Sequence, residues 1–198
     1  MLTVKQLQRL WVAGNYASIS RLCLEMRPEV SARLITEGAR PIAAAAMIIM
    51  RLDELGQAHH PFVAQLIRTL LKSQEADGGW QDPITTAFAL KALLTSRGAG
   101  VAVNRAAAYL ACLQKEDGLW PKEPLRRMPC DPFVSAVILF LLVNEPVFRS
   151  AIRLEDALRA LNSPEVTSAE REAAALFQSM RARYAWISRP VTPQLAWS

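Results

Sequence analysis

One phrase occurs twice in this chain at a spacing of 40 residues. Residues 70–80 read Leu-Leu-Lys-Ser-Gln-Glu-Ala-Asp-Gly-Gly-Trp, and residues 110–120 read Leu-Ala-Cys-Leu-Gln-Lys-Glu-Asp-Gly-Leu-Trp. Gln, Asp, Gly and Trp occupy the same places in both copies. A period of this size indicates a repeat protein, in which each unit buries its apolar face against the next. No other feature of the sequence restricts the fold as strongly.

A second shared phrase follows each tryptophan and predicts the start of a helix. It reads Asp-Pro-Ile-Thr-Thr-Ala at 82–87 and Asp-Pro-Phe-Val-Ser-Ala at 131–136. The carboxylate accepts hydrogen bonds from free backbone N–H groups, and Pro takes the first helical position, where no donor is needed. The Asp-Gly pair of the first phrase ends the preceding helix, with Gly in the left-handed conformation. The two copies of this Asp-Pro phrase are 49 residues apart, whereas the copies of the first phrase are 40 apart. The second unit therefore carries nine additional residues, which we place within 121–129.

Apolar stretches of helical length lie between these signals, most of them with a proline at or near the start. Residues 43–50 and 133–143 are apolar nearly all round, which predicts helices that are buried on every face. The stretches 61–74 and 103–115 mix polar and charged side chains with apolar ones, which predicts an outer layer of helices. The helices expected in the repeats are 42–55, 61–74, 84–96, 103–115 and 133–143.

The flanks of the repeats also read as helical. Thr3-x-x-Gln6 and Thr167-x-x-Glu170 are capping boxes, and the second predicts a helix that continues to about residue 187. We therefore expect a single domain, 1–198. Its expected parts are an N-terminal helical cap at 1–40, the repeats at 41–145, C-terminal helices at 146–187 and an extended tail at 188–198.

Composition and charge restrict the partners that the chain can have. The sequence is 52% hydrophobic and 21% charged, which suits one domain with a substantial core. The net charge is +5, but acidic and basic residues are scattered through 1–175 without the stripe of cations that follows a phosphate backbone. We therefore expect no nucleic-acid partner.

The spacing of the cysteines and the length of the apolar runs indicate the cellular compartment of the protein. Cys23, Cys112 and Cys130 are odd in number and widely spaced, which is typical of free thiols in a reducing environment. The N-terminus lacks the basic-then-apolar order of a signal peptide. The longest apolar runs, 42–50 and 133–143, have about half of the roughly 20 residues that span a membrane. These features predict a cytoplasmic protein without a transmembrane segment.

The repeated phrases 71–80 and 113–120 resemble the Gln-Trp motif of squalene and terpenoid cyclases, a repeat shared with protein prenyltransferase β-subunits. The resemblance covers about residues 40–145, and the second copy has Leu119 in place of one Gly. It implies an all-α fold, an α/α toroid in which inner and outer helices alternate. Because the chain has room for only about four hairpins, fewer than a complete ring uses, we expect an incomplete, crescent-shaped toroid.

The resemblance also implies roles for the motif residues. In that family the Gln side chains reach backbone groups at helix ends and the Trp rings pack against them, so that hairpins are tied together. Here the corresponding residues are Gln74, Trp80, Gln114 and Trp120, and we interpret them as structural.

Asp82 and Asp131 have two interpretations. They precede the predicted inner helices, at the end of the ring from which the catalytic acids of toroid enzymes project. Helix capping explains both residues without any chemistry, and the helix dipole keeps such a carboxylate ionised, which does not suit a general acid. The Asp-x-Asp-Asp cluster of the cyclases does not occur in the sequence. We therefore name no catalytic residue and keep these two aspartates as weak candidates.

The zinc site of the prenyltransferases, made of Asp, Cys and His, is also not matched. Cys130 adjoins Asp131 directly, and Val134 stands where the similar phrase of that family carries its His. The only histidines, His59 and His60, belong to a turn before a predicted helix. Catalytic zinc generally needs three protein ligands. We expect neither a metal nor a cofactor.

Aromatic and basic residues gather near the C-terminus. Arg, Tyr and Trp are enriched at binding hot spots, because large side chains bury area at low entropic cost. An alternative is that Tyr184 and Trp186 pack the last helix onto the core. The predicted partner contact consists of Arg181, Arg183, Tyr184, Trp186, Arg189 and Trp197.

Two functions from different classes follow. The first is a non-catalytic, toroid-like repeat protein that binds another protein or assembles with copies of itself. The second is an isoprenoid or terpenoid cyclase-like or prenyltransferase-like enzyme or subunit, whose apolar cavity is completed by oligomerisation. The two functions predict different places for Asp82 and Asp131. An enzyme would have both in one solvent-filled concavity, whereas in a non-catalytic protein they would face separate backbone N–H groups.

Overall fold

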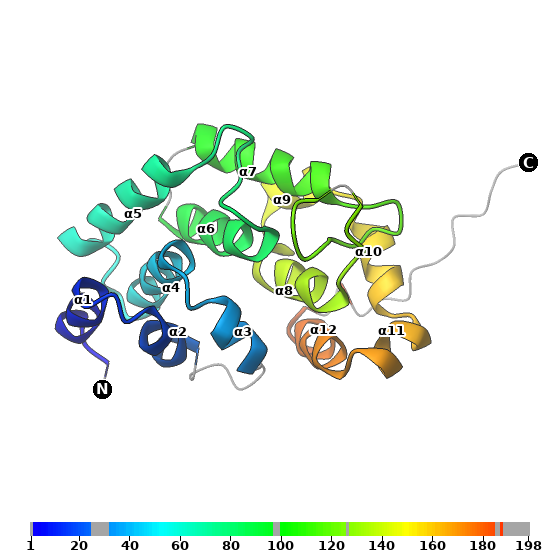
Figure 1. Ribbon diagram of the computed structural model, residues 1–198, viewed down its shortest axis with the longest axis horizontal. Coiled ribbons are helices and arrows are strands. Elements are labelled where there is room, and N and C mark those ends of the chain that lie inside the picture. The colour runs from blue at the N-terminus through cyan, green and yellow to red at the C-terminus, as the bar shows by residue number, and fades with distance from the viewer. Residues whose placement is uncertain (1, 25–31, 97–99, 126, 185–186, 188–198) are drawn as a thin grey trace, which may run out of the picture.

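The computed structural model describes residues 2–24, 32–96, 100–125, 127–184 and 187, and the fold is all-α (Figure 1). None of the helices in these ranges is long and apolar enough to cross a membrane. The helices are α1 (Val4–Val12), α2 (Tyr16–Leu24), α3 (Ala32–Glu37), α4 (Pro41–Glu54), α5 (Pro61–Ser73), α6 (Pro83–Thr95), α7 (Gly100–Leu113), α8 (Pro132–Leu142), α9 (Pro146–Ala151), α10 (Leu154–Leu161), α11 (Pro164–Ala169) and α12 (Arg171–Arg183).

The helices of the repeats form an inner and an outer row. In the inner row α4 packs against α6 and α6 packs against α8. In the outer row α5 covers α4, α7 covers α6, and α9 follows beside α7. Figure 1 shows α5 and α7 along one side of the molecule, with α4, α6 and α8 beneath them. At the two ends of the inner row α2 packs against α4 and α12 packs against α8.

Burial follows the apolar pattern of the sequence. Residues 42–50 of α4, 83–90 of α6 and 133–142 of α8 are all buried, as the absence of a polar face predicts. In α5 only four residues are buried, and they lie on a single face of the helix. These residues are Phe62, Val63, Leu66 and Leu70. The expectation of buried inner helices and half-exposed outer helices is therefore confirmed for these elements.

The predicted helix starts are confirmed to within one residue for α4, α5, α6 and α8, whereas the start predicted at residue 103 is wrong, because α7 already includes Gly100. Proline is the first residue of α4, α5, α6 and α8, where its missing N–H removes no hydrogen bond. At the N-terminal flank, Thr3 is the N-cap of α1 and its hydroxyl accepts a hydrogen bond from the backbone N–H of Gln6, at 3.3 Å.

The capping box predicted at Thr167-x-x-Glu170 is wrong. Thr167 lies inside α11, and its hydroxyl donates to the carbonyl of Ser163 at 3.1 Å. The helix starts earlier because Ser163 caps it and Pro164 is its first residue, a stronger start signal than an isolated threonine. The chain then breaks at Glu170, and α12 follows. The predicted tail, 188–198, lies outside the described residues.

Candidate functional site at the N-terminal ends of the inner helices

Gln74 and Gln114 make the same contacts in their two repeats. The Gln74 side-chain amide donates to the carbonyls of Gly78 and Ala102, both at 2.9 Å. That of Gln114 donates to Gly118 at 2.8 Å and to Arg153 at 3.0 Å. Each glutamine therefore closes its own loop and also ties the loop to the next outer segment of the chain.

Trp80 and Trp120 join the end of an outer helix to the start of an inner helix. Both rings are fully buried. The indole N–H of Trp80 donates to the carbonyl of Leu70 at 2.8 Å, and that of Trp120 donates to Leu110 at 2.7 Å. The backbone N–H groups of the two tryptophans donate to hydroxyls in α6 and α8, at 2.9 and 2.8 Å. The motif residues therefore satisfy helix-end groups, which is the geometry of a structural motif.

One arginine completes each of the two loops, and neither was found from the sequence. Arg105 donates to the carbonyls of Glu75 and Ala76, at 2.6 and 3.0 Å. Arg153 makes similar contacts in the second repeat, with the carbonyl of Lys115, which corresponds to Glu75, and with that of Gln114. These arginines are 48 residues apart, which matches neither spacing of the repeated phrases, so the sequence comparison gave no signal for them.

The additional residues of the second repeat form a loop that leaves the motif unchanged. The backbone N–H of Asp82 donates to the carbonyl of Trp80 at 2.7 Å, across the single residue Gln81. The backbone N–H of Asp131 donates to Trp120 at 2.8 Å, across residues 121–130. An antiparallel bridge between the first and last residues of this loop closes it. The insertion predicted within 121–129 is thus the loop 121–130, which we call the inserted loop.

Asp82 and Asp131 are the N-caps of α6 and α8, and their side chains are only 13% and 18% exposed. Oδ1 of Asp82 accepts from the backbone N–H of Thr85 at 2.9 Å. Oδ1 of Asp131 accepts from the backbone N–H groups of Phe133 and Val134, at 2.9 and 3.1 Å. The aspartates therefore face separate backbone N–H groups, one at each helix.

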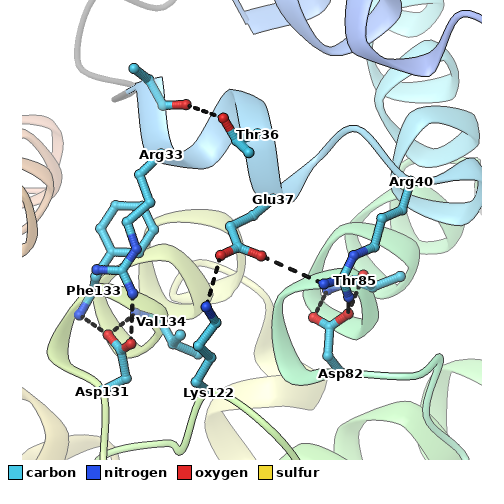
Figure 2. A network of polar contacts seen from close by, with 11 residues as sticks. Arg33, Thr36, Glu37, Arg40, Asp82, Thr85, Lys122, Asp131, Phe133 and Val134 are labelled. Atoms are coloured by element: carbon cyan, nitrogen blue, oxygen red, sulfur yellow. Dashed lines mark hydrogen bonds and ion pairs between the residues drawn. The ribbon is translucent and has the colours of Figure 1, made fainter.

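Both aspartates also bind arginines from the segment that contains α3. Arg33 donates to Oδ2 of Asp131 at 2.7 Å, and Arg40 donates to Oδ2 of Asp82. Glu37 lies between these pairs and contacts Lys122 of the inserted loop at 3.3 Å and Arg40 at 3.7 Å. Figure 2 shows this network across the N-terminal ends of α6 and α8.

The partners of the aspartates were missed in the sequence, although one signal existed. Arg40 precedes Pro41 at the N-cap of α4, the position that Asp82 and Asp131 hold in the following inner helices. An alignment of the three starts would have shown Arg where the others have Asp. Arg33 is 98 residues from its partner and had no local signal.

A cleft of about 260 Å³ lies beside this network. It separates the α3 segment and the start of α6 from the inserted loop. Its lining is mostly charged or polar, so its chemistry suits ionic groups rather than a hydrocarbon chain. The residues that line it are Glu37, Arg40, Gln81, Asp82, Ile84, Lys122, Glu123, Pro124 and Leu125.

The residues considered for zinc make other contacts. The Cys130 thiol donates to a carboxylate oxygen of Asp117 at 3.2 Å. Burial, with the hydrogen bond and negative charge of Asp117, raises the pKa of this thiol to about 12. His60 caps α5 through Nδ1, which accepts from the backbone N–H of Phe62 at 3.1 Å. In the described ranges, no three His, Cys, Asp or Glu side chains are grouped so that they could hold a metal ion.

Half of the predicted C-terminal contact can be placed. Arg181 donates to the side chain of Asn162 at 2.9 Å, and the Arg183 guanidinium lies 5.1 Å from the centre of the Phe140 ring. Tyr184 is partly buried against the core. The other three residues predicted there, Trp186, Arg189 and Trp197, lie outside the described residues.

Comparison with known proteins gives no match to a family profile, a curated protein or a solved structure.

Proposed function

We propose that this chain is a non-catalytic, toroid-like repeat protein of the cytoplasm that binds another protein or assembles with copies of itself. The relation to the α/α toroid rests on the repeated Gln-Trp phrases and is supported by the two rows of alternating helices. A short array exposes surfaces that a closed ring would bury, and such arrays commonly use them for binding. The thiols of Cys112 and Cys130 form no disulfide, which is compatible with a reducing compartment.

One observation carries the proposal. Asp82 and Asp131, the only candidate acids, each use one oxygen to cap a helix and the other to bind an arginine. A general acid must deliver a proton to a substrate, whereas both oxygens of each aspartate already accept hydrogen bonds from groups of this chain. This arrangement supports a structural interpretation of both residues. The charged lining of the adjacent cleft also argues against an isoprenoid ligand.

The test is purification of the tagged chain from its native cytoplasm, with light scattering to measure the mass of the complex. We expect one stoichiometric protein partner or a defined homo-oligomer. Incubation of the purified chain with farnesyl diphosphate is the second arm, and we expect no product. Turnover that is lost in Asp82→Asn or Asp131→Asn would contradict the proposal and favour the enzyme.

The predicted C-terminal contact is tested in the same purification. Residues 188–198 follow α12 (Arg171–Arg183), so their removal should leave the packing of that helix intact. We expect the truncated chain to keep its helical content and to capture less partner. Unchanged capture would show that the tail is not the contact.

A further inference from the structure

The two oxygens of each cap aspartate, as we call Asp82 and Asp131, have different functions. Oδ1 accepts from backbone N–H groups of the helix that follows. Oδ2 accepts from an arginine that belongs to a different part of the chain. Oδ2 of Asp82 also accepts from the hydroxyl of Thr85 in α6, at 2.7 Å. Because capping by Oδ1 does not involve the arginines, the caps do not need the arginine contacts at Oδ2.

A single short segment, 33–40, supplies both arginines. The Arg33 guanidinium lies 4.2 Å from the centre of the Phe133 ring while it binds Asp131, so it combines a carboxylate contact with a cation–π contact. A planar guanidinium suits such a site better than a lysine ammonium does. This surface, formed by the cap aspartates and Phe133, therefore has the chemistry of a receptor for two arginine side chains.

Ion pairs and a cation–π contact join the segment to α6, α8 and the inserted loop, whereas Gly38 is buried close to Met47 of α4. The helix of the segment, α3, has one buried residue, Leu34, and packs against α2, where Ser20 donates to the carbonyl of Ile35 at 2.8 Å. The side chains of Arg33 and Arg40 are 30% and 44% exposed. Ion pairs that are this accessible to water contribute little individually and are weakened by salt.

We propose that segment 33–40 is a displaceable strap, latched by its arginines over the cap aspartates, that withholds this surface from a partner segment carrying two arginines. The proposal deepens the protein-binding function proposed above and rests on it. The strap is an intramolecular occupant, so a partner segment must compete for the same two Oδ2 atoms. Displacement leaves the caps of α6 and α8 in place, because Oδ1 continues to accept from the backbone.

The test uses a fluorescent synthetic peptide with the sequence of residues 32–40 and a control peptide in which both arginines are glutamine. The hosts are the full chain and its R33E/R40E variant, in which repulsion from the aspartates releases the strap. The matched control is R149E/R159E, which makes the same change of net charge on α9 and α10. It separates recognition by the cap aspartates from general attraction of a basic peptide to a more acidic chain.

We expect fluorescence anisotropy to show that the arginine peptide binds R33E/R40E at least about tenfold more tightly than it binds the wild type or the control variant. The glutamine peptide should not bind. Adding D82N and D131N should abolish binding while the helical content is kept, because Asn is also a good N-cap. Equal binding to all three hosts, or no binding to R33E/R40E, would overturn the proposal.

A second measurement needs no peptide. In hydrogen exchange of the wild type, raising NaCl from about 0.05 to about 0.5 M should speed exchange of the α3 amides several-fold and leave α4 and α6 unchanged. Salt-independent protection of α3, equal to that of α4, would overturn the strap. The strap proposal would also be overturned if the chain captured its partner by another surface and bound no arginine peptide. In that case the protein-binding function would still hold. The protein-binding function itself is overturned by catalytic turnover, or by purification that yields neither a stoichiometric partner nor a defined homo-oligomer.

Discussion

The rings of Trp80 and Trp120 are fully buried, and each indole N–H donates to the carbonyl of a residue ten positions earlier. Trp120 also stacks on Phe148 of α9, with 6.2 Å between the ring centres. Removing such a ring leaves a large cavity and an unpaired carbonyl within the hairpin.

We predict that Trp80→Ala and Trp120→Ala each lower the free energy of unfolding by about 3–5 kcal/mol. Urea unfolding followed by circular dichroism measures the loss. Trp11→Ala is the matched control, since Trp11 is only partly buried against the core and should cost clearly less. A Trp120→Ala chain that unfolds at the same urea concentration as the parent would show that the tryptophan does not tie the hairpin.

The loop glycines provide a second test at single positions. Gly118 has φ of 86°, and a Cβ there would lie 2.5 Å from the backbone nitrogen of Ala157 in α10. Gly56 has φ of 70°, but a Cβ there would meet nothing within 4 Å. Both alanine substitutions strain the backbone by about 1 kcal/mol. We predict that Gly118→Ala is the more destabilising of the two in thermal unfolding, and equal losses would contradict the close approach of α10.

The thiols should differ in reactivity because only the thiolate is nucleophilic. The pKa of Cys130 is raised from its ordinary value of 9.0 to about 12, whereas Cys112 is exposed. We predict that iodoacetamide at about pH 8 modifies Cys112 first in the folded chain and that the difference disappears in urea. Because the folded state holds the Cys130 proton more tightly than the unfolded state does, the contribution of this thiol to the free energy of unfolding is constant below pH 9. That contribution is lost as the pH rises toward 12. Mass spectrometry of the peptides reads out the modification, and equal rates in the folded chain would contradict the raised pKa.

Among the elements, the inserted loop is the one that the repeat does not require. The hydrogen bond from the backbone N–H of Asp131 to Trp120 across this loop is 2.8 Å long, close to the 2.7 Å of the bond from Asp82 to Trp80 across Gln81 alone. Gln81 has φ of 64°, a conformation that favours glycine.

We predict that replacing residues 121–130 by one glycine gives a folded chain whose stability changes by about 1–2 kcal/mol, since the contact of Lys122 with Glu37 and the bridge that closes the loop are lost. Circular dichroism and thermal unfolding measure the result. Loss of helical content would show that the loop is part of the core of the fold. A matched deletion within α7 should abolish folding, because it shifts a buried face out of register.

The elements that the sequence predicted correctly are those with a strong local signal at both ends. Asp or His followed by Pro begins α5, α6 and α8, and loops with Asp-Gly follow α5 and α7. The short helices after residue 145 were not predicted individually, because α9 and α11 have only six residues each and present too few turns for an apolar period to show. At the site, the caps could be predicted, whereas Arg33 could not, since it is 98 residues from Asp131. The only sequence signal for Arg40 was its place at the N-cap of α4.

On the scale of the whole molecule, segment 33–40 links parts of the chain that the repeat alone does not connect. Its ion pairs extend from the N-terminal flank to α6, to α8 and to the inserted loop. We predict that the melting temperature of the wild type falls modestly as NaCl rises to about 0.5 M. We also predict that R33Q/R40Q shows a smaller salt dependence, because its three ion pairs with Asp131, Asp82 and Glu37 are already removed. Differential scanning calorimetry measures both, and an identical salt dependence would contradict the contribution of these pairs.

The central claim is that Asp82 and Asp131 are structural residues that cap helices and bind arginines. The most direct measurement is a double-mutant cycle in urea unfolding on Arg33 and Asp131, with Asp131→Asn to remove the charge and Asp131→Ala to remove the cap as well. The account predicts a loss of about 1–2 kcal/mol for Asp131→Ala, a smaller loss for Asp131→Asn, and a coupling energy of about 0.5–1 kcal/mol with Arg33→Gln. An Asp131→Ala chain as stable as the parent, with no coupling to Arg33, would contradict it.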